Sequence, residues 1–258
     1  MSEEILRPSP KNKTVSLFVT CLVDMIYPQT GVSVVEILDH LGIPMEFRAG
    51  QTCCAQPAFN AGFWDDARVV AKNFLRAFDG ADLIVTPSGS CASMVRHYYP
   101  VLFKDDPVLL EKATRIASIT WEFTEYLVDG LGITDLGAKL PPTKVAFHYA
   151  CHGLRLMHLD SQARALAEHI EGVTVLNMNG ADECCGFGGL FAVKMADVSG
   201  AMLERKLTNI NAAEADVILT GDCGCIAQMN GGLSRSGEPQ KVRHVADLLA
   251  EGLQKIQI

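Results

Sequence analysis

The sequence predicts an α/β protein made of two tandem, pseudo-symmetric cysteine-rich units, each a small, mainly parallel sheet flanked by helices. Three observations lead to this prediction. Cysteines recur at nearly equal offsets in the two halves, the residues around them recur as well, and short apolar runs alternate with helical patterns. We place the first unit at residues 1–136 and the second at residues 137–258.

Three cysteine sites of the first half return in the second half at offsets of 130, 131 and 134 residues. The surrounding residues also repeat, since TVSLFVTC is similar to KVAFHYAC, and ADLIVTPSGSC is similar to ADVILTGDCGC. The chain therefore contains an internal repeat. The paired sites are Cys21 with Cys151, Cys53-Cys54 with Cys184-Cys185, and Cys91 with Cys225.

The expected elements follow the same repeat. Apolar runs rich in β-formers predict buried strands at 15–20, 83–86, 145–149 and 217–220. Apolar residues at helical spacing predict helices from Phe63 to Phe78, with Asn60 as the cap, and from Phe191 to Met202. Segments 118–127 and 242–253 are expected to pack as a strand followed by a helix. Because strands alternate with helices, the sheets should be parallel. Residues 130–143, with glycines and two prolines, are the expected linker.

Bulk composition excludes several classes of function. The 258 residues carry a formal net charge of −8, which offers no basic footprint to a nucleic acid or an anionic membrane. The longest apolar runs have the length of strands, so no membrane insertion is expected. The N-terminal segment MSEEILRPSPKNK lacks the apolar core of a signal peptide, and we expect a cytoplasmic protein.

The nine cysteines indicate metal or redox chemistry. Their number is odd and no export signal precedes them, which argues against a disulfide framework. Buried cysteines that act as small hydrophobes would lie within apolar runs. Here the cysteines stand beside Gly, Ser, Asp and Pro at the ends of segments instead.

The predicted topology should gather four thiolates in each half. Cys21, Cys91, Cys151 and Cys225 each follow a predicted strand, and sites in open α/β sheets form beyond the carboxyl ends of strands. The two cysteine pairs fall in loops before a helix, whose N-terminus favours thiolates. Four thiolates suit a [4Fe–4S] cluster, one or two per chain, or a tetrahedral zinc ion.

Local sequence around the cysteines favours iron–sulfur over zinc. Structural zinc sites draw on C-x₂-C pairs, whereas adjacent cysteines fit better where each sulfur reaches a different iron. Gly186, Gly188 and Gly189 would let backbone N–H groups approach the cofactor closely. His148 and His152 flank Cys151 and could be ligands, but we expect them to hydrogen-bond around the cluster.

Cys151, then Cys184-Cys185-Gly186, then Cys225 resembles the cysteine-rich CCG domain found in heterodisulfide reductase and in the iron–sulfur subunit of glycolate oxidase. The resemblance spans nearly the whole chain. The phrases HYACH, ECCGFGG, TCCAQPAFNAG and TPSGSC are most similar to the lactate utilization protein A family, which has two copies of the domain. It implies that the motif cysteines of both copies hold iron–sulfur clusters.

The sequence departs from the CCG pattern at three places. Ala55 stands where the first copy would have glycine, and Ser88 stands where the closing C-x-x-C would begin. In the second copy the extra cysteine, Cys223, is one place out of register. Cys223 could be a fifth ligand, a redox thiol or a bystander, and we expect it to take part in the site. If only one copy binds a cluster, we expect the first copy to be the empty one.

The resemblance implies an iron–sulfur electron-transfer subunit of a system that oxidises L-lactate to pyruvate, together with other iron–sulfur or flavin subunits. Such a chain would be an oxidoreductase subunit without complete activity on its own. No flavin or nicotinamide fingerprint occurs, so hydride removal from lactate would need a cofactor from elsewhere. Two alternatives stay open, namely a thiol–disulfide oxidoreductase of heterodisulfide reductase type and a non-catalytic zinc protein.

Overall fold

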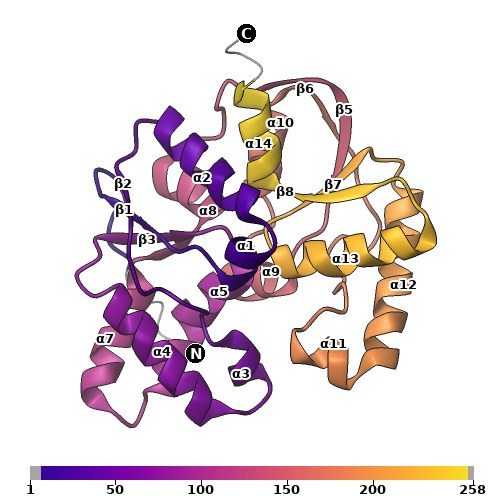
Figure 1. Cartoon of the computed structure of the whole chain (residues 1–258). Helices are drawn as coiled ribbons and strands as arrows, with labels where there is room; N and C mark the ends of the chain where they lie inside the picture. Colours follow the sequence, from indigo (N-terminus) through magenta and orange to yellow (C-terminus); the bar gives the residue numbers. More distant parts are fainter. Residues whose placement is uncertain (1–6, 255–258) are drawn as a thin grey trace.

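The computed structural model describes residues 7–254, which form two halves of the same layout (Figure 1). Each half contains a four-stranded parallel sheet, with strand order β2-β1-β3-β4 in the first and β6-β5-β7-β8 in the second. The predicted fold class, two tandem α/β units, is therefore confirmed. The strands are β1 (Val15–Leu17), β2 (Met45–Phe47), β3 (Leu83–Thr86), β4 (Thr120–Glu122), β5 (Lys139–Phe147), β6 (Glu171–Val175), β7 (Val217–Thr220) and β8 (Lys241–His244).

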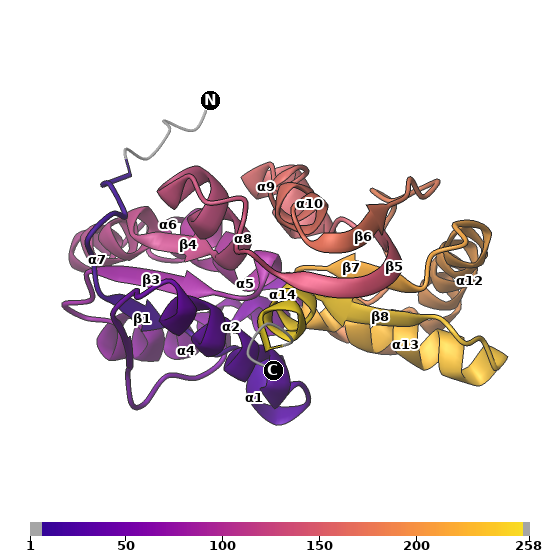
Figure 2. The ribbon, with the colours of Figure 1, turned by 90° about the horizontal axis from the view of Figure 1, so that it is seen from above.

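Helices cover both faces of each sheet, and the two sheets lie side by side (Figure 2). In the first half the helical segments are α1 (Cys21–Met25), α2 (Pro28–His40), α3 (Gln56–Asn60), α4 (Trp64–Ala77), α5 (Gly89–Ser93), η1 (Met94–Tyr98), α6 (Tyr99–Leu102), α7 (Pro107–Ser118), α8 (Phe123–Glu125) and η2 (Tyr126–Leu131). In the second half they are α9 (Cys151–Met157), α10 (Gln162–Glu168), α11 (Leu190–Lys194), α12 (Ala196–Ala212), α13 (Cys223–Ser236) and α14 (Val245–Gln254).

The central strands β3 and β7 match the predicted apolar runs, because parallel strands covered on both faces need apolar side chains on both sides. Strand β1 forms at its predicted start but ends at Leu17, three residues before the predicted end. Helix α4 also forms as its spacing predicts, burying Ala67, Ala71 and Phe74 on one face. The expected cap was wrong. Phe63 is the N-cap and makes no side-chain cap bond, while Asn60 ends the preceding helix α3.

Three features at the edges of the sheets differ from the sequence prediction. The edge strands β2 and β6 were not predicted. The linker is shorter than expected, since η2 runs to Leu131 and β5 already begins at Lys139. Within β5 the pairing with β6 shifts register between Lys139 and Thr143. This stretch contains Pro141 and Pro142, which have no N–H to donate to a neighbouring strand.

A shared core joins the two halves. One hydrophobic cluster runs from β1 and α2 in the first half to β5 and α14 in the second. Helix α14 packs against α2, next to each other in both views (Figures 1 and 2), and Thr30 Oγ1 donates to Asp247 Oδ2 at 3.1 Å. Because the core is continuous, the carboxyl ends of both sheets have a fixed relation to each other. Within residues 7–254, no helix combines the length and apolar character needed to cross a bilayer.

Candidate metal centres

The first half brings four cysteines together at the carboxyl end of its sheet. Cys21 is the first residue of α1, Cys53 and Cys54 lie in the loop before α3, and Cys91 lies in α5. The Sγ atoms of Cys21 and Cys53 are 3.8 Å apart, and those of Cys54 and Cys91 are 3.4 Å apart. The predicted convergence of these thiols is present in the structure; whether they bind metal stays a prediction.

The second half repeats this arrangement. Cys151 is the first residue of α9, Cys184 and Cys185 lie in the loop before α11, and Cys225 lies in the first turn of α13. The Cys151 thiol is hydrogen-bonded to Cys184, and the Cys185 thiol is hydrogen-bonded to Cys225. The Sγ atoms of Cys185 and Cys225 and a ring nitrogen of His148 all lie within 4.8 Å of one another.

Polar caps fix the helices that carry these cysteines. Thr20 caps α1 by accepting a bond from Val23 N, and Ser88 caps α5 by accepting one from the backbone N–H of Cys91. Asp222 caps α13 in the same way, by accepting from Gly224 N. Each cap replaces a missing partner at a helix N-terminus, where the helix dipole also stabilises a thiolate.

Backbone conformation explains the residue that follows each cysteine pair. Gly186 has φ +88°, and a Cβ there would lie 2.6 Å from the carbonyl oxygen of Ser199. Ala55, at the equivalent place, also has a positive φ, at 74°. The first copy therefore keeps the backbone shape of the CCG motif although it has lost the glycine. Gly188 and Gly189 also have positive φ, and Gly186 N–H donates to Cys184 Sγ at 3.4 Å.

Protons are distributed unevenly among the thiols. Hydrogen bonds from Cys21 and Cys54 lower the pKa of Cys53 to about 3, and bonds from Cys151 and Cys185 lower the pKa of Cys184 to about 2. The four donors have raised pKa values for the same reason and because they are partly or fully buried. Further ionisation would crowd negative charges in a poorly solvated space, so the donor set fits a bound cation or a metal cluster.

Adjacent cysteines face different partners in both halves. Cys53 contacts Cys21 while Cys54 contacts Cys91, and Cys184 and Cys185 divide in the same manner. The two thiols of each adjacent pair also contact each other, so the four sulfurs of each half form one connected group. This arrangement agrees with ligands placed around a metal group of more than one atom. Two sulfurs on one tetrahedral ion would lie about 3.8 Å apart, the distance between Cys21 and Cys53, whereas Cys54 and Cys91 are closer, at 3.4 Å.

Two histidines lie beside the second group. His152 Nδ1 is 3.7 Å from Cys151 Sγ. His148 is buried, and in the described part of the chain no group has hydrogen-bond geometry to either of its ring nitrogens. The carbonyl of Ala181 lies near the ring. Burial and the positive charge of Lys206 lower the pKa of His148 to about 3, so its imidazole is neutral.

Lys206 is a component of this site that the sequence analysis missed. Its side chain is fully buried, donates to the carbonyl oxygen of Gly180, and acts electrostatically on Cys185 and Cys225. A lysine at a buried position of an amphipathic helix was the available signal, because α12 places it on the face with Leu203 and Leu207.

Cys223 lies apart from the second group. Its thiol is buried and hydrogen-bonded to Thr30 on α2. Its pKa is raised mainly by burial, and also by the negative charges of Asp222 and Asp247. Residue 223 is the first of α13 and Cys225 comes two residues later, so their side chains leave the helix in different directions. Its role as a ligand stays a prediction.

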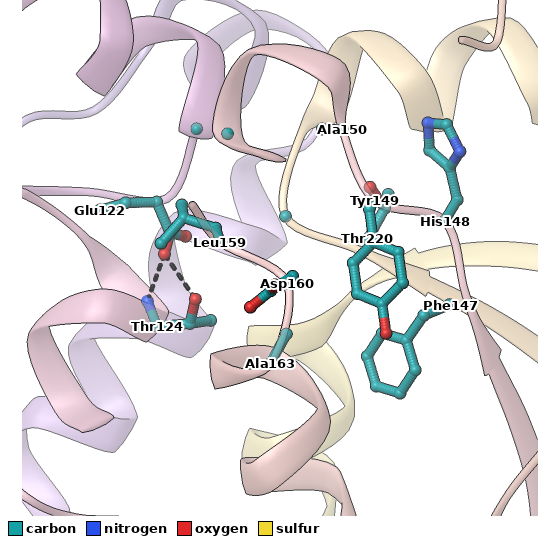
Figure 3. Close-up of a pocket in the computed structure, with 13 residues that line it drawn as sticks. Glu122, Thr124, Phe147, His148, Tyr149, Ala150, Leu159, Asp160, Ala163 and Thr220 are labelled. Carbon is teal, nitrogen blue, oxygen red and sulfur yellow. Dashed lines mark hydrogen bonds between the residues drawn. The ribbon is translucent and has the colours of Figure 1, made fainter. Parts of the chain in front are cut away.

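A small cavity of about 40 Å³ opens between the halves (Figure 3). Glu122, Thr220 and Asp160 line it, together with backbone of Gly89 and Gly153. Glu122 Oε2 accepts bonds from Thr124, whereas Oε1 has no partner among the residues in the structure. The volume suits a few water molecules.

Comparisons with known proteins agree with this architecture. The model of the cysteine-rich CCG domain matches residues 15–96 and 145–230. Lactate utilization protein A 2 of Bacillus cereus (strain 03BB102) is 45% identical over 93% of this chain and 99% of its own length. Lactate utilization protein A of Geobacillus thermodenitrificans (strain NG80-2) is 43% identical over 91% of this chain and 98% of its own.

A crystal structure of a hypothetical protein from Helicobacter pylori has the same fold, with a TM-score of 0.61 and 12% identity. It aligns with 96% of this chain, which spans about half the length of that protein (51%). The family model matches both halves of the chain, and each half gathers four cysteine thiols. These relatives are also 43–45% identical to the chain over nearly its whole length. The chain belongs to the CCG cysteine-rich domain family, and within it to the lactate utilization protein A family.

Proposed function

We propose that this chain is an iron–sulfur electron-transfer subunit that holds a [4Fe–4S] cluster in each half. The observation that carries the proposal is the convergence of four thiols at the carboxyl end of each sheet, with adjacent cysteines directed to different partners. The ligands would be Cys21, Cys53, Cys54 and Cys91 in the first half, and Cys151, Cys184, Cys185 and Cys225 in the second.

A bound cluster would supply one-electron chemistry. The residues of the chain hold the thiols in place, shield them from water and balance their charge. Cys54, Cys91, Cys185 and Cys225 are buried, while the other four are half-buried. Each group therefore has one side in the core and one side toward the surface, where an electron could be exchanged with another protein.

The substrate system is inferred from the relatives. Proteins of this length and similarity are named for lactate utilization, which supports a role in oxidising L-lactate to pyruvate. We propose that the chain works with other iron–sulfur or flavin subunits, in the cytoplasm, and is not a complete dehydrogenase by itself. A subunit that supplies the hydride-accepting cofactor would then pass electrons to these clusters.

Metal analysis of protein purified without oxygen tests the proposal. We expect about eight irons and an equal amount of acid-labile sulfide per chain. Cys54→Ser and Cys185→Ser should each remove about half, because each substitution empties one half. Zinc without sulfide would contradict the proposal and support the zinc alternative.

A second candidate function is thiol–disulfide exchange. It is favoured by Cys53 and Cys184, which combine partial exposure with pKa values lowered to about 3 and 2. Alkylation of the anaerobic protein distinguishes the two functions. Thiols that bind a cluster should resist iodoacetamide until iron is removed, whereas exchange-active thiols should react at once.

A further inference from the structure

The two cysteine groups differ in one pair of buried residues. His148 directly follows β5, as Phe18 directly follows β1, and each lies three residues before the first cysteine of its half. Their backbone N–H groups make equivalent bonds, from Phe18 to Val85 O and from His148 to Leu219 O, both of 2.9 Å. His148 therefore occupies the place of Phe18.

Lys206 occupies the place of Phe74 in the same way. The buried residues of α12 and α4 have identical spacing, with an offset of 132. They are Ser199, Leu203, Lys206, Leu207 and Ile210 in α12, and Ala67, Ala71, Phe74 and Leu75 in α4 with Phe78, the C-cap residue that follows α4.

In the first half this pair is aromatic. The rings of Phe18 and Phe74 meet edge to face with centroids 4.8 Å apart, and Tyr99 adds a further edge contact to Phe74 at 5.4 Å. Cys54 and Cys91 belong to the same hydrophobic cluster as these rings. The Tyr99 hydroxyl is bonded to the carbonyl oxygen of Cys54. The first group therefore faces hydrocarbon, with no cation at this pair of positions.

In the second half the pair is polar. The imidazole of His148 has a ring nitrogen within 4.8 Å of the sulfurs of Cys185 and Cys225. The carbonyl of Ala181 lies near the ring, but no group within 7–254 has hydrogen-bond geometry to its nitrogens. The ammonium of Lys206 is enclosed by protein and acts on the same two sulfurs. A buried cation and an unpaired imidazole both cost free energy unless negative charge and acceptors lie beside them. Thiolates with a bound cluster supply both.

We propose that His148 and Lys206 give the cluster of the second half a higher reduction potential than that of the first half. This inference rests on the proposed function. Reduction adds one negative charge to a cluster, and the nearby ammonium and an imidazole N–H stabilise that charge, whereas aromatic rings do not. An electron that enters the cluster of the first half is passed to that of the second, which oxidises the first and reduces the second by one electron.

The acidic groups near the second cluster do not cancel this difference. Glu183 is paired with Arg205. Asp222 lies at the junction of the halves, where its carboxylate accepts bonds from Ser88 Oγ, Ser90 N and Gly224 N. Asp182 also acts on Lys206, but it stands on the surface side of the loop, where solvent screens its charge.

Potentiometric titration followed by electron paramagnetic resonance tests the inference on protein purified without oxygen. The wild type should show two separate transitions, and the one at higher potential should persist in Cys54→Ser, which empties the first half. His148→Phe and Lys206→Met should each lower the midpoint potential of that transition by about 59 mV. For a one-electron couple this shift is a tenfold change in the ratio of oxidised to reduced cluster at a given potential. Lys206→Arg keeps the charge and should restore the wild-type value.

Phe18→Leu is the matched control, because it changes the equivalent position of the first half without adding polarity. It should leave the higher transition unchanged. Wild-type protein without iron and sulfide would defeat the proposed function and this inference together. Two filled clusters whose potentials do not respond to His148→Phe or Lys206→Met would defeat the inference alone, as would loss of the higher transition in Cys54→Ser.

Discussion

The hydroxyl of Ser88 donates to Asp222 Oδ2 at 3.2 Å, and the two residues occupy equivalent positions in the two halves. Each is the N-cap of the helix that carries the last cysteine of its group. Asp222 also accepts from Ser90 N at 3.0 Å, so a single carboxylate links the helix starts of both halves. Two residues at equivalent positions of the repeat therefore contact each other and join the two halves.

Asp222→Ala should lower the free energy of unfolding by about 3 kcal/mol, because it removes bonds to a charged acceptor and leaves buried donors without partners. Ser88→Ala removes one donor and should cost about 1 kcal/mol. Urea unfolding of both variants checks the expectation. Equal losses would show that the carboxylate does not join the halves.

The repeated cysteines and apolar runs predicted the convergence of the thiols, whereas the segments between them gave less information. Cysteines that follow apolar runs had to converge, because parallel strands end at one edge of a sheet. The strand β2 could not be found in this way. It has three residues at the edge of its sheet, and Phe47 and Glu46 are exposed, so no apolar run marks it. The boundary between α3 and α4 could not be predicted either. Asn60 is the last residue of α3, and α4 begins after Phe63, which makes no side-chain cap bond.

The polar pair of the second half could not be predicted from patterns either. Lys206 reads as an ordinary charged helix residue until the buried faces of α12 and α4 are compared position by position. His148 was noticed beside Cys151, but its lack of a protein partner is a property of the folded chain. The cysteines are visible in the sequence pattern, whereas the charges around them depend on the folded structure.

The residues after the two cysteine pairs should respond differently to exchange of glycine and alanine. Gly186→Ala should lower the free energy of unfolding by about 3 kcal/mol, since the new Cβ would lie 2.6 Å from Ser199 O in a left-handed conformation. Ala55→Gly should change it by less than about 1 kcal/mol, because relief of strain offsets the lost methyl burial and added chain freedom.

Urea unfolding of the pair of variants provides the comparison, and iron content shows whether the sites survive. A costly Ala55→Gly together with a neutral Gly186→Ala would mean that the two loops do not share one backbone shape.

The buried carboxyl group of Glu122 should make stability depend on pH. Burial raises its pKa from 4.5 to about 7. Between these values the folded state keeps a proton that the unfolded state has lost, so the free energy of unfolding falls as pH rises. The decrease in the free energy of unfolding caused by Glu122 is absent below pH 4.5 and reaches about 3 kcal/mol above pH 7.

Glu122→Gln isolates this contribution from that of the buried histidines. The variant should gain stability relative to the wild type as pH rises from about 5 to about 8, measured by urea unfolding at each pH. A difference that stays constant over this range would show that Glu122 is ionised in the folded protein throughout.

Cys223 gives the last test, since the motif and the structure lead to different expectations. Its place as the first cysteine of C-G-C predicts a ligand, yet its thiol is bonded to Thr30, and its side chain leaves α13 in a different direction from that of Cys225. From this position we expect Cys223→Ala to leave iron and sulfide content and both reduction transitions unchanged. The free energy of unfolding should fall by about 1 kcal/mol, because the thiol contact at the junction with α2 is lost.

Cys225→Ala is the control variant and should lose the second cluster. If Cys223→Ala also loses iron, the thiol must turn toward the group when metal binds, and the site of the second half would have five cysteine ligands.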